Sequence, residues 1–142
     1  MKKIVIINGP NLNLLGRRET TIYGDLSFEE YINQLKNRFQ QIEFEYFQSN
    51  SESDIINKIH SCATATLGLI INPGAFGHTS IAIADAIGSI DTKCIEVHIS
   101  NIYSREQFRH YTLLSSKCVG SISGFGLLSY QLAVEAILNQ SA

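Results

Sequence analysis

The sequence has little that would direct it to nucleic acid or to a membrane. Its 142 residues carry a formal net charge of -2, and acidic and basic side chains are mixed along the chain. A nucleic-acid-binding domain usually gathers its positive charge into a stripe, and a membrane-surface protein into a polybasic segment. No unbroken apolar stretch reaches the roughly eighteen residues that a membrane span needs. We therefore expect a soluble protein whose partner is a small molecule or another subunit.

Cysteine is scarce as well. Cys62, Cys94 and Cys118 form an odd set that contains no CxxC motif and no Cys/His pair at zinc spacing. Such usage is typical of reduced thiols in the cytosol, and free cysteines are usually small buried residues. We therefore expect neither a metal site nor a catalytic thiol.

Apolar patterns typical of strands and helices alternate along the chain. The predicted strands cover residues 3–7, 42–48, 67–71, 94–99 and 117–122, and the predicted helices 27–41, 53–63, 79–87, 105–109 and 127–138. Ser27, with Glu30 three residues later, predicts the cap of the first helix. Strands that alternate with helices favour parallel βαβ units with helices on both faces of the sheet. The chain is thus predicted to be one α/β domain, residues 1–142, with a flavodoxin-like, doubly wound, five-stranded parallel sheet.

Polar residues gather where the predicted strands end. The clusters are Asn8, Asn11 and Asn13 after the first strand, Asn72, Gly74 and His78 after the third, and Glu96, His98, Ser100 and Asn101 at the fourth. Each cluster alone is what an ordinary turn contains. Ligands of doubly wound sheets bind outside the carboxyl ends of the strands, so three such clusters at one edge predict a pocket.

The connection after the first strand is long for a βα loop, which usually has about two to six residues. It contains Arg18 and Tyr23. A guanidinium about 4 Å from the phenol would favour the phenolate by roughly 4 kcal/mol at an effective dielectric near 20. Arg18 can thus make Tyr23 a usable base, although a tyrosine in such a loop is more often a packed turn aromatic.

Glu96 and His98 are two residues apart in a predicted strand, so their side chains lie on the same face. A carboxylate beside an imidazole can fix its tautomer and favour its protonated form, which suits a proton donor. A hydrogen-bonded pair with a purely structural role explains the spacing as well.

Further candidates follow the fourth strand. Arg105 and Arg109 are four residues apart in the predicted helix 105–109 and would share a face, from which Arg109 can bind ligand oxygens. The amides of Ile99 and Ser100 can hold a carboxylate in an anion nest.

Asp85 is the only charged residue in the apolar helix predicted over residues 79–87. Such a helix is normally buried in a core or an interface, and a buried carboxylate needs a partner. We expect Asp85 to meet that partner within its own subunit or across a subunit contact.

The chain resembles the type II 3-dehydroquinate dehydratases. It contains in order the motifs NGPNLNLLGRRE, IYG, QSN, INPGAFGHTS, IEVHISN, REQFRH and GFG. The resemblance implies a dodecamer built as a tetramer of trimers and a hydro-lyase without a cofactor. The implied reaction is anti elimination of water from 3-dehydroquinate through an enolate, in the shikimate pathway of aromatic amino acid biosynthesis.

The resemblance also implies how the catalytic residues divide the reaction. Tyr23 would remove the proton beside the ketone, with Arg18 favouring its phenolate. Asn11 would hold the water that stabilises the enolate oxygen. His98, oriented by Glu96, would protonate the departing hydroxyl.

The remaining implied residues bind substrate. Asn72, His78 and Arg109 would contact the ring hydroxyls, and the amides of Ile99 and Ser100 the carboxylate. Asp85 would reach the site of a neighbouring subunit. Two positions depart from the family pattern, because threonine is common at Gly77 and histidine at Ser51.

The main alternative is a flavodoxin-like small-molecule binding or signalling module without catalysis. Such a module would want a phosphate loop or an acidic pair, whereas the first strand ends in Asn8, Gly9 and Pro10 without GxGxxG or GK[ST]. A subunit that kept the fold and lost the chemistry would lack Tyr23 or His98, and both are present.

Overall fold

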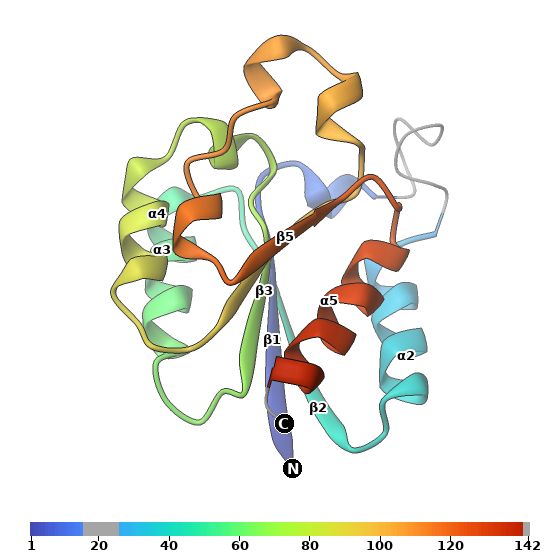
Figure 1. The fold of residues 1–142 in the computed structure, drawn as a ribbon. Coiled ribbons are helices and arrows are strands. Elements are labelled where there is room, and N and C mark those ends of the chain that lie inside the picture. The colour runs from blue at the N-terminus through green and yellow to red at the C-terminus, as the bar shows by residue number, and fades with distance from the viewer. Residues whose placement is uncertain (16–25, 141–142) are drawn as a thin grey trace.

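The computed structural model describes residues 1–15 and 26–140 (Figure 1). The strands are β1 (Lys2–Asn8), β2 (Ile42–Gln48), β3 (Gly68–Asn72), β4 (Cys94–His98) and β5 (Gly120–Ser123). The α-helices are α2 (Phe28–Arg38), α3 (Glu52–Ser61), α4 (Ile81–Gly88) and α5 (Leu128–Gln140). Short 3-10 helices are η1 (Leu12–Leu14), η2 (Gly74–His78), η3 (Ile102–Ser104), η4 (Gln107–Arg109) and η5 (Ser115–Lys117).

The strands form one parallel sheet in the order β2-β1-β3-β4-β5. Helices α2 and α5 cover one face of the sheet, and α3 and α4 cover the other (Figure 1). This is the flavodoxin-like strand order, so the predicted fold class is confirmed. The winding reverses between β1 and β3, and ligands of such sheets bind outside the carboxyl ends of the strands at that switch point.

Strand β1 lies in the centre of the molecule and is apolar on both sides. Ile4 and Ile6 face the core formed with α2 and α5, whereas Val5 and Ile7 face the core formed with α3 and α4. None of the four is more than 1% exposed. Each such side chain contributes roughly 1.5–3 kcal/mol through burial, which explains why the run is continuously apolar.

Serine hydroxyls mark the beginnings of three helices. The Ser27 hydroxyl accepts a hydrogen bond from the amide three residues on (3.2 Å), so the predicted cap is confirmed. Ser51 and Ser80 do the same for α3 and α4 (3.3 and 3.0 Å). The helices predicted to begin at residues 53 and 79 begin instead at Glu52 and Ile81.

Helix α4 is buried on one face only within a single chain. Ile83, Ala84 and Ile87 are at most 5% exposed, whereas Ile81 is 67% exposed and Asp85 lies on the same outer side. Within a single chain, one face of α4 is thus buried in the core and the other is exposed. Asp85 is exposed within its own chain.

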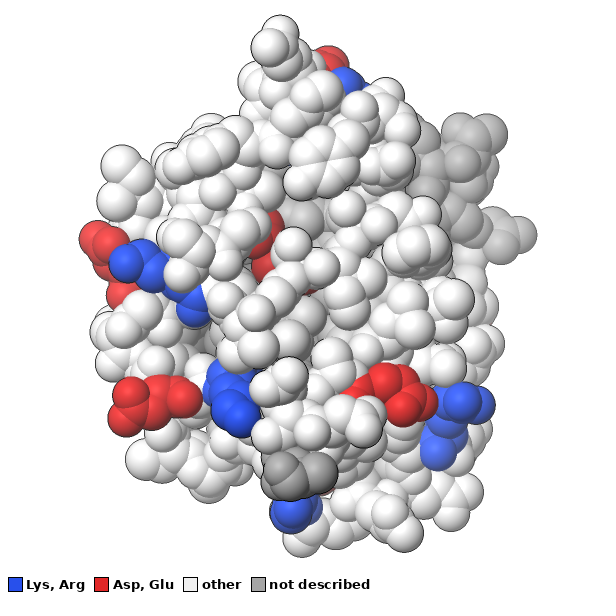
Figure 2. Space-filling view, in the orientation of Figure 1, with Lys and Arg blue, Asp and Glu red and all other residues white. Residues whose placement is uncertain are grey.

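The surface has no single sign of charge. The face visible in Figure 2 carries lysine and arginine close to aspartate and glutamate in scattered groups. Among residues 1–15 and 26–140, no helix is both long and apolar enough to cross a membrane.

Candidate active site

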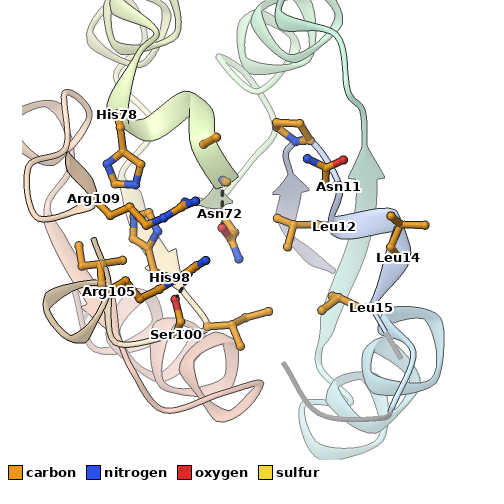
Figure 3. Close-up of a pocket in the computed structure, with 15 residues that line it drawn as sticks. Asn11, Leu12, Leu14, Leu15, Asn72, His78, His98, Ser100, Arg105 and Arg109 are labelled. Carbon is orange, nitrogen blue, oxygen red and sulfur yellow. Dashed lines mark hydrogen bonds between the residues drawn. The ribbon is translucent and has the colours of Figure 1, made fainter. Parts of the chain in front are cut away.

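A pocket of about 150 Å³ lies at the carboxyl edge of the sheet, between the loops that follow β1, β3 and β4 (Figure 3). Predicted site residues that line it are Asn11, Asn72, His78, His98, Ile99, Ser100 and Arg109. Arg105, whose role the sequence left open, lines it as well. The loop that carries Asn11 faces His98 across the pocket (Figure 3). The polar clusters that follow the three strands therefore do meet in one cavity.

The loop after β1 is held by the QSN motif. Asn11 has a left-handed backbone (φ 70), which asparagine tolerates well. Its amide donates to Asn50 Oδ1 (3.0 Å), and Gln48 Nε2 donates to the same oxygen (3.2 Å) and to the Gly9 carbonyl (3.1 Å). Gln48 and Asn50, from the end of β2, thus set the position of Asn11.

Asn72, at the end of β3, is fixed at both ends of its amide. Its Oδ1 accepts from the Gly74 amide (3.2 Å), and its Nδ2 donates to the Tyr130 hydroxyl (2.9 Å). Asn72 is 3% exposed and Tyr130 is fully buried. Burial raises the pKa of Tyr130, outweighing the opposing hydrogen bonds, so the phenol stays neutral.

Glu96 and His98 form the pair that their spacing in β4 predicts. His98 Nε2 lies 2.6 Å from Glu96 Oε2, and the carboxylate is fully buried. Its other oxygen accepts from Thr112 Oγ1 (3.1 Å) and Ser115 Oγ (2.7 Å). Burial raises the pKa of Glu96, but the hydrogen bond and charge of His98 and the two hydroxyls lower it by more. Glu96 is thus an ionised acceptor, and the His98 nitrogen that faces it carries a proton.

The ring of His78 stacks on that of His98, with 5.9 Å between the centroids. His78 Nδ1 lies 2.8 Å from the Tyr111 carbonyl, which can only accept, so Nδ1 carries the proton. Burial lowers the pKa of His78, the Tyr111 carbonyl opposes this, and the charges of His98 and Arg109 add to the lowering. A neutral His78 with an unprotonated Nε2 follows.

The two arginines reach the pocket by a route that differs from the predicted one. The helix predicted over residues 105–109 is wrong, because Arg105 is extended and ends η3, and a separate turn, η4, carries Arg109. Arg105 donates to the Ser100 hydroxyl (3.3 Å), and Arg109 Nε donates to Glu106 Oε1 (2.9 Å). Two short turns, rather than one helical face, thus bring both guanidinium groups to the cavity.

The closing GFG motif braces the loop after β4. The Gly124 amide donates to the His98 carbonyl (3.1 Å), and the Gly126 amide donates to the Ile99 carbonyl (3.0 Å). Both glycines have positive φ, and a Cβ on Gly124 would lie 3.2 Å from the Asn101 Cβ. The motif thereby positions the segment that contains Ile99 and Ser100 at the pocket wall.

The match to a known family covers nearly the whole chain. Residues 2–138 match the model of the family described as dehydroquinase class II. The chain belongs to this family. The curated relatives of this dehydroquinase-family chain include the 3-dehydroquinate dehydratase of Caldicellulosiruptor bescii, 50% identical over 140 residues that cover 96% of this chain and 97% of that protein. That of Exiguobacterium sp. is 49% identical over 137 residues, covering 96% and 94%.

Solved structures of the dehydroquinase family have the same fold. The type II dehydroquinase of Butyrivibrio crossotus superposes with a TM-score of 0.92 at 46% identity and covers 96% of this chain and 97% of its own. The enzyme of Propionibacterium acnes gives 0.92 at 41% identity, covering 96% of each chain. These likenesses do not favour the alternative of a flavodoxin-like module without catalysis.

Only some of the predicted catalytic residues lie in the part of the chain that the structure describes. His98 and Asn11 line the pocket, and Glu96 supports His98 from behind, outside its lining. Tyr23 and Arg18 lie outside the described residues. Of the predicted binding residues, Asp85 alone is absent from this pocket's lining, since it lies on the outer face of α4.

Several supporting residues of the site were not assigned from the sequence. They are Gln48, Asn50, Thr112, Ser115 and Tyr130. The QSN motif was recognised only as part of the resemblance, and Thr112, Ser115 and Tyr130 carry no local signal. Among residues 1–15 and 26–140, no group of three or more His, Cys, Asp or Glu side chains is arranged to hold a metal.

Proposed function

We propose that this protein is a 3-dehydroquinate dehydratase, a hydro-lyase that forms 3-dehydroshikimate by anti elimination through an enolate. It would act as one catalytic domain without a cofactor, in the cytoplasm and in the shikimate pathway. The observation that carries the proposal is the buried Glu96–His98 pair beside a pocket lined by Asn72, His78 and Arg109, in a chain of this family.

His98 acts as the acid. Its Nε2 is engaged by Glu96, so Nδ1 is the nitrogen left for a ligand. As the enolate re-forms the carbonyl, its electron pair makes the ring double bond and the carbon–oxygen bond breaks. A proton from the imidazolium passes to the departing hydroxyl, which leaves as water. The ionised Glu96 holds the ring through Nε2 before and after the transfer.

Tyr23 acts as the base. Its phenolate, favoured by Arg18, takes the proton beside the ketone, and the electron pair moves onto the carbonyl oxygen as the enolate. A water held by Asn11 stabilises that oxygen. The placement of Asn11 by Asn50 supports this role, because its position does not depend on the substrate.

Substrate binding falls to the other lining residues. Arg109 and the unprotonated Nε2 of His78 suit hydroxyl groups, since one donates and the other accepts. The amides of Ile99 and Ser100 would hold the carboxylate. Asn72 would contact a ring hydroxyl from the floor of the pocket.

The assembly would be a homododecamer, a tetramer of trimers, in which Asp85 serves the site of a neighbour. The outer face of α4 supports this, because it presents Ile81, 67% exposed, next to Asp85. A contact with a neighbouring subunit at this face would bury Ile81 together with Asp85. Mixing Asp85→Ala with Tyr23→Phe subunits should restore some activity if each site combines two chains, whereas no recovery after proven exchange would count against sharing.

The activity is tested by incubating the protein with 3-dehydroquinate and following the ultraviolet absorbance of the conjugated product. Tyr23→Phe should lower kcat by about a hundredfold or more with little change in substrate binding. Borohydride added with substrate should leave the activity intact, because no imine forms in this mechanism. If Tyr23→Phe keeps more than about a tenth of the wild-type turnover, Tyr23 is not the base.

A further inference from the structure

The hydroxyl of Tyr130 lies between two asparagines at the switch point of the sheet. Asn8 ends β1 and Asn72 ends β3, and the two are register partners in the parallel ladder. We propose that Tyr130 is a positioning residue of the active site, which holds the Asn72 amide so that an N–H faces the substrate. The inference rests on the proposed function only in that Asn72 touches the substrate.

The hydrogen bonds run in one direction. Asn72 Nδ2 donates to the Tyr130 oxygen (2.9 Å), and the Tyr130 hydroxyl donates to Asn8 Oδ1 (2.7 Å). Asn8 Nδ2 in turn lies 3.4 Å from the Tyr46 oxygen. Because the phenol has a single proton and Asn8 takes it, the phenol can only accept from Asn72.

This chain of hydrogen bonds determines which atoms of the Asn72 side chain remain for a ligand. Its Oδ1 already accepts from the Gly74 amide (3.2 Å), and one Nδ2 hydrogen is taken by Tyr130. A second Nδ2 hydrogen is left, so the side chain offers the pocket a donor. A flipped amide would turn Nδ2 toward the Gly74 N–H and Oδ1 toward a phenol whose proton is committed to Asn8. The native orientation is therefore imposed by the protein before substrate arrives.

Tyr130 has little freedom to move away. Its ring is fully buried, packs edge-on to Phe28 at 4.8 Å between centroids, and lies 6.2 Å from the ring of Tyr31. It belongs to α5, whereas Asn72 is 58 positions earlier in the chain. The last helix thus closes one face of the sheet and also sets a contact at the pocket floor.

A purely structural role for the hydroxyl makes a different prediction. Loss of a buried hydrogen bond would then lower stability and leave the activity of the folded protein unchanged, or lower it whatever residue stands at position 72. A positioning role makes the effect of Tyr130 on activity depend on Asn72. A double-mutant cycle separates the two.

The experiment compares wild type, Tyr130→Phe, Asn72→Ala and the double variant by kcat and KM for 3-dehydroquinate. The same proteins are titrated with 3-dehydroshikimate, so that the cycle closes on Kd even where turnover is slow. We expect Tyr130→Phe to lower kcat/KM by roughly tenfold, mainly through KM, the scale of one hydrogen bond. In the Asn72→Ala background the same change should have less than about a twofold effect.

Tyr31→Phe is the matched control, because it removes a phenol hydroxyl from the same aromatic cluster but outside this chain of hydrogen bonds. Its activity should equal that of wild type. Asn8→Ala reaches the chain from its far end and serves if Tyr130→Phe does not fold, with a smaller loss that again needs Asn72. Equal losses in both Asn72 backgrounds, no loss in Tyr130→Phe, or an equal loss in Tyr31→Phe would each overturn the inference. Wild-type protein inactive on 3-dehydroquinate would instead overturn the proposed function.

Discussion

The charge of Glu96 can be removed with little change in shape. Glutamine is nearly isosteric, and its amide oxygen can still accept from His98 Nε2, which lies 2.6 Å from the carboxylate. Its amide nitrogen would turn toward Thr112 and Ser115, whose hydroxyls can accept as well as donate. Glu96→Gln therefore tests the charge separately from the geometry.

The size of the effect follows from the distance. Unit charges 2.6 Å apart attract by roughly 6 kcal/mol at an effective dielectric near 20, before the desolvation of both groups is subtracted. General acids contribute about 10²- to 10⁴-fold to rate. We therefore expect kcat of Glu96→Gln to be lower than that of wild type by a factor in that range. KM should change by less than about threefold, because Glu96 does not line the substrate pocket.

The same variant makes a prediction for stability against pH. The pKa of Glu96 is lowered in the folded protein, because its hydrogen bonds to His98 and the hydroxyls outweigh the effect of burial. The stability that ionised Glu96 contributes is therefore fully present above the pKa of a glutamate in the unfolded chain, about 4.3. It is lost as the pH falls through the lower pKa of Glu96 in the folded protein. Denaturant unfolding should show the wild type more stable than Glu96→Gln near neutrality, with the difference shrinking below about pH 4.

Ser115→Ala is the matched control, since it removes one hydrogen bond to Glu96 and keeps the charge. We expect a loss of about 1 kcal/mol in stability and a severalfold loss in kcat, much smaller than in Glu96→Gln. A kcat for Glu96→Gln within about threefold of wild type would refute the reasoning, and so would a stability difference that is constant across this pH range.

Three further predictions concern the pocket and its frame. The ring of His78 should be neutral at pH 7 with its proton on Nδ1, because burial lowers its pKa, and histidine NMR should show titration below about pH 6.5; titration above that value would contradict it. Gly9→Ala should lower the stability of the protein by about 1–3 kcal/mol and lower its activity, because the new Cβ would lie 2.3 Å from the Pro73 carbonyl oxygen. Gly120→Ala is the control: no atom lies within 4 Å of its new Cβ, so its thermal unfolding should be close to that of wild type. Exhaustive chelation should leave turnover of 3-dehydroquinate unchanged, and activity recovered only by adding back a metal would disprove this.

The elements that could be predicted from the sequence are those with a long periodic pattern. The strand predicted over residues 42–48 has those bounds in the structure, and the Ser27 cap is where its motif placed it. The strand predicted over residues 117–122 is observed as β5, Gly120–Ser123, because the turn η5 occupies Ser115–Lys117 before it. A few polar residues there fit a turn and an edge strand equally well.

The turn that carries the arginines shows why short segments are harder to predict. The four-residue spacing of Arg105 and Arg109 suits an α-helix, but the Arg109 amide donates to the Glu106 carbonyl, three residues earlier (2.9 Å). That bond belongs to a 3-10 turn, and Glu106 also accepts from the Arg109 side chain. In so short a segment, individual hydrogen bonds outweigh periodicity.

The location of the pocket could be predicted, but the partners of its side chains could not. A parallel sheet brings the residues after successive strands to one edge, so Asn72 and His98 had to lie near each other whatever the details. A buried polar group must also find a partner, but any later segment can supply it. Here the last third of the chain does so, with Ser115 bound to Glu96 and Tyr130 bound to Asn72. The strand ends thus present the groups that would meet the substrate, and residues beyond β4 fix their charge and orientation. Changes in those later residues should therefore alter catalysis without touching the ligand.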